Sequence, residues 1–145
     1  METKVTMPIQ VLGHQPSYSN EHAAGLDLRL TTESPVRLEQ GEHFIAHTGL
    51  SVEIPEGYFG LICVRSGLGM KGLMLANAIG VIDEDYRGEI RIPFFYHGEE
   101  EMVLEDGERV AQMILVPYVQ AQCREVEVLT DSQRGNRGFG SSGRF

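Results

Sequence analysis

The sequence predicts an all-β domain, and two observations carry this prediction. Short apolar or alternating segments recur along the chain, separated by turns rich in glycine, proline and acidic residues. Only residues 65–72 have the end signals of a helix. With 145 residues, of which 41% are hydrophobic and 17 are glycine, the chain fits one domain with its own core. We expect a barrel or jelly-roll arrangement of short strands.

The expected strands follow one another from end to end. Residues 26–30 and 50–54 alternate apolar and polar side chains, which is typical of half-buried strands. Residues 58–64 form a continuous apolar run, which predicts a more buried strand. Further strands are expected at residues 8–12, 35–38, 42–47, 79–82, 89–96, 102–104, 109–116 and, with weak alternation, 118–129.

Residues 77–89 predict a hairpin with a carboxylate at its tip. An apolar run, 79–82, leads into an acidic turn that begins at Asp83, and an alternating strand then leaves the turn. Such a turn would hold Asp83 rigidly, although an isolated acidic turn is more often merely solvated. An EF-hand loop is excluded because Arg87 occupies the fifth position from Asp83, where a calcium ligand is needed.

Residues 65–72 predict the one helix, of about two turns at most. Ser66 can cap its start and Gly72 can end it. The same residues, with the guanidinium of Arg65, suit phosphate oxygens, although a purely structural junction would look alike. Gln112 presents a similar choice, because an amide inside an apolar strand must find a partner in the core or on a ligand.

Residues 130–145 differ from the rest, being rich in glycine, serine and arginine with few large apolar side chains. Such a segment cannot bury enough surface to repay its ordering entropy, so we expect it to be flexible until pinned. We therefore divide the chain into a barrel domain, 1–129, and a flexible C-terminal lid, 130–145. The dinucleotide-like spacing of glycines 138, 140 and 143 is discounted, because no helix can begin so close to the end. A plain disordered tail and a lid over a nucleotide both remain open.

The net charge of −9 argues against nucleic acid as a partner, because nucleic acid requires a basic face. It leaves room for one small polyanion held by a few arginines, backbone N–H groups and a divalent cation. No apolar run approaches the roughly 20 residues of a membrane helix, and no export signal is recognised, so we expect a cytoplasmic protein without a membrane partner. Cys63 and Cys123 are expected to be buried free thiols in a reducing compartment.

Five segments, taken in order, resemble the motifs of the trimeric dUTP diphosphatases (dUTPases). They are residues 24–28, 65–68, 77–89, 107–112 and 134–143. The resemblance implies a β-clip, or distorted jelly-roll, barrel that forms a homotrimer with shared active sites. It also implies Mg²⁺-assisted hydrolysis of dUTP to dUMP and diphosphate, which would supply dUMP for dTMP synthesis and keep uracil out of DNA.

The resemblance further implies a role for each site residue. Asp83 would be the general base that activates water for in-line attack on the α-phosphate. Asp27 would help to place Mg²⁺ through its water shell. Tyr86 would pack against the sugar and exclude a 2′-hydroxyl. The uracil would be read by Asn77 and the backbone of Gly80, Val81 and Ile82; the phosphates would be held by Arg65, Ser66, Gly67 and Gln112, with Arg91 as a further candidate; and the lid would consist of Arg134, Phe139, Gly140, Ser141 and Ser142.

Three residues depart from what is usual in that family: Gly69 replaces an alanine, Arg137 a glycine and Glu84 a small residue. None of them removes a proposed functional side chain. Two alternatives remain open at this point. One is an enzyme of the dCTP deaminase type, which shares the fold but acts on the base. The other is a nucleotide-sensing regulatory protein with a dUTPase-like site.

Overall fold

The structure is a computed structural model that describes residues 4–139, and it confirms the all-β prediction. These residues contain twelve short strands and one short helix. The elements are β1 Ile9–Val11, β2 Ser17–Tyr18, β3 Leu26–Arg29, β4 Val36–Leu38, β5 His43–His47, β6 Leu50–Val52, β7 Tyr58–Val64, α1 Ser66–Gly69, β8 Leu73–Leu75, β9 Gly80–Ile82, β10 Arg91–Tyr96, β11 Met102–Leu104 and β12 Arg109–Pro117. No helix within 4–139 is long and apolar enough to cross a membrane.

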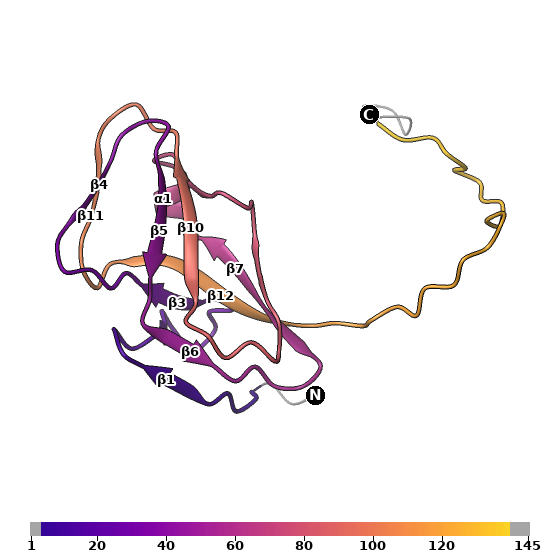
Figure 1. Cartoon of the computed structure of the whole chain (residues 1–145), viewed down its shortest axis with the longest axis horizontal. Helices are drawn as coiled ribbons and strands as arrows, with labels where there is room; N and C mark the ends of the chain where they lie inside the picture. Colours follow the sequence, from indigo (N-terminus) through magenta and orange to yellow (C-terminus); the bar gives the residue numbers. More distant parts are fainter. Residues whose placement is uncertain (1–3, 140–145) are drawn as a thin grey trace.

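The strands form small antiparallel sheets that wrap one apolar core (Figure 1). The largest sheet has the order β2-β3-β12-β7-β9, and a second has the order β5-β10-β8. Two further pairs, β1 with β6 and β4 with β11, close the sides. Leu28, Phe94 and Val110 lie at the centre of the core, almost fully removed from solvent, because the alternating strands that carry them turn their apolar faces inward.

The register of β12 brings three distant parts of the chain into one row. Gln112 lies opposite Asp27 of β3 on one side and opposite Cys63 of β7 on the other. A register irregularity between Arg109 and Ala111 precedes this row. Such irregularities re-aim side chains at the edge of a ladder, and here Arg109 is turned toward Asp27.

The predicted hairpin over residues 77–89 is wrong. The strand before Asp83, β9, pairs with β7, whereas the strand that follows the acidic loop, β10, pairs with β5 and β8. The loop between β9 and β10 is long enough to carry the chain from one sheet to the other. Local alternation predicts each strand correctly but cannot choose its partner, because non-local pairing is decided by core packing.

The predicted strand over residues 118–129 is also wrong. After β12 the chain leaves the barrel and runs away from it as a single extended segment (Figure 1). Val119 is 94% exposed and Val128 is 84% exposed. Cys123 is consequently exposed and Cys63 is half-buried, so neither is the fully buried thiol expected. A strand needs a neighbour for its N–H and C=O groups, and within this chain the segment has none among the described strands.

The helix is shorter than predicted. It covers Ser66–Gly69, a single turn, and its N-cap is Arg65 in an extended conformation, with no side-chain capping bond. Ser66 therefore lies inside the first turn and does not cap it. The helix ends at Gly69 with Met70 as its C-cap, so Gly72 does not end it as expected. Gly72 lies in the connection to β8 with a φ of +98°, where a side chain would be strained and would meet the backbone of Gly98.

Candidate active site

Asp27 is a buried carboxylate held between two arginines. Its side chain is 5% exposed. One oxygen lies 3.0 Å from Nε of Arg65, and the other lies 3.2 Å from Nη1 of Arg109. Burying a carboxylate is costly unless its charge is paired, and the two guanidinium groups supply that pairing. The cluster gathers residues that follow β7, lie on β3 and begin β12, and it carries a net positive charge.

Gln112 lies beside this cluster and fits into space left by a glycine. Its amide nitrogen donates to the carbonyl of Val64, at 3.4 Å, directly before Arg65. A Cβ on Gly25 would overlap the carboxamide of Gln112 and approach its Cδ to 2.9 Å. The absence of a side chain at residue 25 therefore allows the amide to reach the edge of the cluster.

The short helix supplies further donors at the same end of β7. Ser66 and Gly67 are exposed at its first turn. The backbone carbonyl of Arg65 accepts from Leu68 at 3.1 Å and from Gly69 at 2.9 Å, so the N–H groups of Ser66 and Gly67 precede the first helical bond. The structure thus brings together Asp27, Arg65, Ser66, Gly67 and Gln112, which the sequence analysis singled out, and it adds Arg109. The signal for Arg109 was available, because it is the basic residue of the segment 107–112.

The turn between β8 and β9 presents Asn77 and the start of β9. Asn77 is exposed, and Ala78 has a φ of +64°, an uncommon conformation for a non-glycine residue. Gly80 packs against Ile62, where an added Cβ would lie 2.9 Å from the Cβ of that side chain. The close packing at Gly80 fixes the turn on β7, while Val81 stays exposed and Ile82 half-buried.

Asp83 is exposed at the end of β9, in a turn that is tied to the barrel by Glu84. The backbone N–H of Gly57 donates to Glu84 at 2.7 Å, and the backbone N–H of Tyr118 donates to the carbonyl of Gly57 at 3.1 Å. Desolvation, followed by a hydrogen bond to Glu84 and the nearby acidic charges, raises the pKa of the Tyr118 hydroxyl. A groove of about 530 Å³, lined by Phe59, Val81, Asp83 to Asp85, Tyr118 and Gln120, lies at this turn.

Tyr86 follows in the same loop, and its ring lies over Gly88. Its hydroxyl donates to the backbone carbonyl of Glu89 at 2.9 Å. Arg91 points elsewhere: its Nε lies 3.7 Å from the carboxylate of Glu89, and it lies opposite His47 on β5. The structure therefore does not bring Arg91 to the arginine cluster of Asp27.

Residues 130–139, the described part of the segment expected to form a lid, lie away from the barrel (Figure 1). Arg134 and Arg137 bond each other's backbone carbonyls, at 2.8 and 3.1 Å, within a tight turn. Phe139 is fully exposed. Gly140, Ser141 and Ser142, which were assigned to the lid from the sequence, lie outside the described residues.

The two groups of candidate residues lie at opposite ends of β7. Arg65 follows its last residue, Val64, whereas Ile82 pairs with Gly60, which places Asp83 near Phe59. Arg65 comes six positions after Phe59 along the strand, a span of about 20 Å. Arg65 also points toward β3, across β12, while Asp83 belongs to β9 on the other side of β7.

The fold and these two groups define a class of protein. A small β barrel carries arginine, amide and backbone donors suited to a polyphosphate, and a separate exposed carboxylate suited to activating water. Residues 13–143 match the family described as dUTPase, and the chain belongs to that family.

Similar proteins agree with this assignment. The chain is 44% identical over 131 residues to a deoxyuridine 5′-triphosphate nucleotidohydrolase of Alcanivorax borkumensis, covering 89% of this chain and 87% of the relative. It is 46% identical to that of Burkholderia cenocepacia, covering 89% and 88%. A solved structure of the Staphylococcus bacteriophage 80alpha dUTPase with dUPNHPP superposes with a TM-score of 0.86 at 29% identity, covering 97% of this chain and all of that one. The chain is thus an enzyme, a dUTP diphosphatase, and its substrate is dUTP.

Proposed function

We propose that the enzyme converts dUTP to dUMP and diphosphate through a water molecule that Asp83 activates for in-line attack on the α-phosphorus. The observation that carries this mechanism is the exposure of Asp83 at a turn anchored by Glu84. An exposed carboxylate on a fixed backbone can accept a proton from water without first losing a protein partner. In the pentacoordinate transition state, negative charge would develop on the phosphate oxygens, and positive side chains would stabilise that charge.

The triphosphate would bind the cluster around Arg65. Several hydrogen-bond donors lie at one end of β7. They are the guanidinium of Arg65, the backbone N–H groups of Ser66 and Gly67, the hydroxyl of Ser66 and the amide of Gln112. Donors of this kind bind phosphate oxygens in charge-assisted hydrogen bonds. We add Arg109 to the set, because it approaches the same carboxylate as Arg65 does.

Mg²⁺ fits this cluster through its water shell. Within 4–139 no three His, Cys, Asp or Glu side chains gather as a metal cluster, and the carboxylate of this cluster that would face the ion is Asp27. Both oxygens of Asp27 already accept from guanidinium groups, yet each keeps a lone pair for a metal-bound water. When bound, Mg²⁺ would neutralise charge on the phosphate oxygens. Asp27 would orient the ion's water shell and hold Arg65 in place.

The base and sugar would bind at β9 and the loop after it. The amide of Asn77 and the backbone of Gly80, Val81 and Ile82 offer the donors and acceptors that a uracil edge requires. Tyr86 presents a ring whose hydroxyl is already engaged by a backbone carbonyl. We assign to this ring the exclusion of a 2′-hydroxyl.

We further propose a homotrimer in which each site takes residues from more than one chain. The phosphates of a nucleotide are bonded to one another, so the base that attacks one of them must lie close to the groups that hold the others. In a single chain Asp83 and Arg65 lie about 20 Å apart along β7. Assembly would bring the Asp83 turn of one subunit to the Arg65 cluster of another.

The segment after β12 supports the same assembly. It leaves the barrel with Val119, Val128 and Leu129 exposed. Isolated apolar side chains on an extended segment gain stability when a second copy covers them. We propose that residues 130–145 then act as the lid, in which Arg134 contacts phosphate and Phe139 stacks on the base, with Gly140, Ser141 and Ser142 completing the closure. Residues 1–129 would form the domain that carries the barrel, whose last strand, β12, ends at Pro117.

In the cell this reaction would supply dUMP for dTMP synthesis and keep uracil out of DNA, and we expect it in the cytoplasm. The test is diphosphate release measured across all common nucleoside and deoxynucleoside triphosphates. We expect rapid release from dUTP alone, abolished by EDTA and restored by Mg²⁺. Release of ammonia from dCTP would support the deaminase alternative and overturn the proposal.

A further inference from the structure

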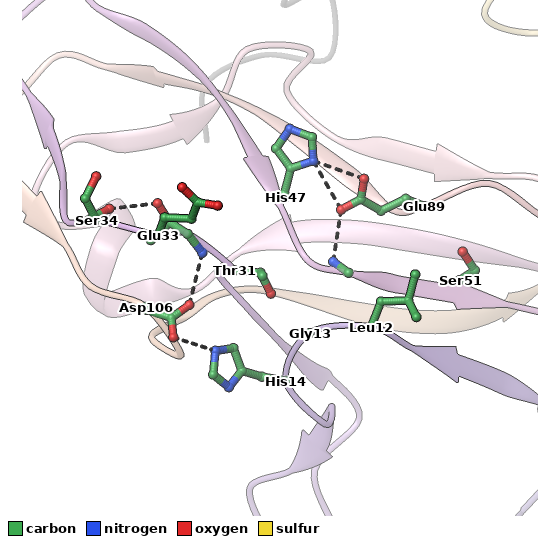
Figure 2. A pocket seen from close by; sticks show the side chains of 12 residues that line it. Leu12, Gly13, His14, Thr31, Glu33, Ser34, His47, Ser51, Glu89 and Asp106 are labelled. Atoms are coloured by element: carbon green, nitrogen blue, oxygen red, sulfur yellow. Dashed lines mark hydrogen bonds and ion pairs between the residues drawn. The ribbon is translucent and has the colours of Figure 1, made fainter.

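The turn between β5 and β6 forms hydrogen bonds with the residues that directly precede β10. The carboxylate of Glu89 lies 3.0 Å from Nδ1 of His47 and accepts the N–H of Gly49 at 2.9 Å (Figure 2). On the backbone beside it, the buried hydroxyl of Thr48 donates to the carbonyl of Ile90 at 2.7 Å. The side chain and the backbone at the end of the acidic loop are therefore both fixed to the barrel.

The charges around Glu89 favour its ionised form. Partial burial would raise the pKa of this carboxyl, but the hydrogen bond from Gly49, the hydrogen bond and charge of His47, and the charge of Arg91 together hold the pKa below its ordinary value. Glu89 and His47 line a pocket that also contains a second ionisable pair, His14 and Asp106, which lie 3.0 Å from each other (Figure 2). Glu89 is thus an anionic anchor at neutral pH.

Tyr86 depends on that anchor for its orientation. Its hydroxyl donates to the backbone carbonyl of Glu89, and within residues 4–139 this is the one hydrogen bond that its side chain makes. The ring lies against Gly88, where an added Cβ would come within 2.7 Å of the ring carbon Cζ. Tyr86 is 40% exposed, so little packing would hold the ring if the carbonyl moved.

We propose that Glu89 is a positioning residue for Tyr86. The contacts of His47 and Gly49 with its carboxylate fix the backbone carbonyl of Glu89, which orients the Tyr86 ring. The orientation of the ring in turn sets the selection of deoxyribose over ribose. The inference rests on the proposed role of Tyr86 at the sugar. Glu89 itself touches neither substrate nor the reacting atoms in this assignment. Loosening the carbonyl would let the ring swing away and leave room for a 2′-hydroxyl.

The first test compares kcat/KM for dUTP and UTP in Glu89→Ala and Glu89→Gln. Glu89→Ala removes every side-chain contact to the turn, and the preference for dUTP should narrow by roughly 3- to 10-fold, the equivalent of one lost hydrogen bond. Glu89→Gln keeps an acceptor for the Gly49 N–H and should recover part of the preference. Glu101→Gln, which breaks an exposed ion pair with Arg37, is the matched control and should leave the ratio unchanged.

A double-variant cycle separates positioning from general destabilisation. Tyr86→Phe keeps the ring but removes the hydroxyl, so a second change at Glu89 should then have no further effect on the ratio. Additive effects would overturn the inference, as would an unchanged ratio in Glu89→Ala. Should Glu89→Ala fail to fold, Glu89→Gln decides in the same cycle.

A spectroscopic arm distinguishes this inference from the role of Tyr86. In protein labelled with 3-fluorotyrosine, the ¹⁹F resonance lost in Tyr86→Phe identifies Tyr86. That resonance should shift or broaden in Glu89→Ala and stay in place in Glu101→Gln; an unchanged resonance in Glu89→Ala overturns the positioning of Tyr86. If Tyr86→Ala leaves the dUTP-to-UTP ratio unchanged, the sugar role of Tyr86 falls, whatever the resonance shows.

Discussion

Asp27 and Arg65 are joined by an ion pair of 3.0 Å that reaches across β12 from β3 to the end of β7. The two residues have opposite tasks in the proposed reaction, since one faces a cation and the other an anion. In the free enzyme Asp27 pairs with Arg65 and also with Arg109. A triphosphate that binds Arg65 competes with Asp27, and a cation that arrives with the triphosphate offsets this competition.

The first prediction follows from that pair. Asp27→Asn keeps the shape of the side chain and removes the charge that orients the water shell of Mg²⁺. We expect the Mg²⁺ concentration for half-maximal dUTP hydrolysis to rise by roughly 10- to 100-fold, the effect typical of an outer-shell partner. Asp106→Asn, at a surface carboxylate paired with His14, is the control and should match the parent enzyme. A Mg²⁺ requirement unaltered in Asp27→Asn would remove Asp27 from the metal site.

The second prediction concerns the proposed base. Asp83→Asn keeps the size of the side chain but cannot accept the proton, so kcat should fall by roughly 10²- to 10⁴-fold. Binding of a non-hydrolysable dUTP analogue, measured by calorimetry, should persist because the phosphate and base contacts remain. Asp85→Asn changes an exposed carboxylate in the same loop and should retain most of the activity. Near-native turnover by Asp83→Asn would show that another group activates the water.

The third prediction is a dependence of stability on pH. The pKa of Glu89 in the folded state lies below its ordinary value of 4.5. Its contribution to folding is therefore fully present above about pH 4.5 and is lost as the pH falls further toward the folded-state pKa. The thermal midpoint of the parent enzyme should exceed that of Glu89→Gln above this pH, and the gap should close below it. A gap that is constant from pH 3 to pH 7 would contradict the assignment.

The fourth prediction tests the shared site. Asp83→Asn has an intact lid, and a chain that ends before Arg134 has an intact Asp83. Unfolded together and refolded, they should form mixed trimers with some complete sites, and activity should reappear well above that of either variant alone. Differently tagged chains that copurify would prove the mixing. Mixed trimers without activity would mean that Asp83 and the lid of each site come from the same chain.

The strands could largely be read from the sequence, whereas their partners could not. The alternation of residues 26–30 and the apolar run 58–64 correspond to β3 and β7, because side-chain periodicity reflects local burial. The pairing of β9 with β7 depends on the core as a whole. The strand expected at residues 118–129 failed for the same reason, since a weakly alternating segment becomes a strand only beside a neighbour.

In the site, likewise, the residue types could be read from the sequence, whereas the contacts between them could not. Residue type and motif pointed to Arg65 and Gln112, and the register of β12 brings both to Asp27. The ion pair of Arg109 with Asp27 was not predicted: the segment 107–112 drew attention to a basic residue there, but its direction depends on the register irregularity in β12. The anchoring of the acidic loop by His47 was missed because its partner, Glu89, lies on a distant segment.

The contact between Gly25 and Gln112 constrains how this sequence can change over generations. Any side chain at residue 25 would occupy the space of the carboxamide, because Gln112 lies in β12 and Gly25 directly precedes β3, the strand paired with β12. A larger residue can therefore replace Gly25 only after Gln112 has been replaced by a smaller residue, and a protein with that smaller residue lacks the amide. Related sequences that keep Gln112 should therefore also keep Gly25, so the two positions should change together or not at all.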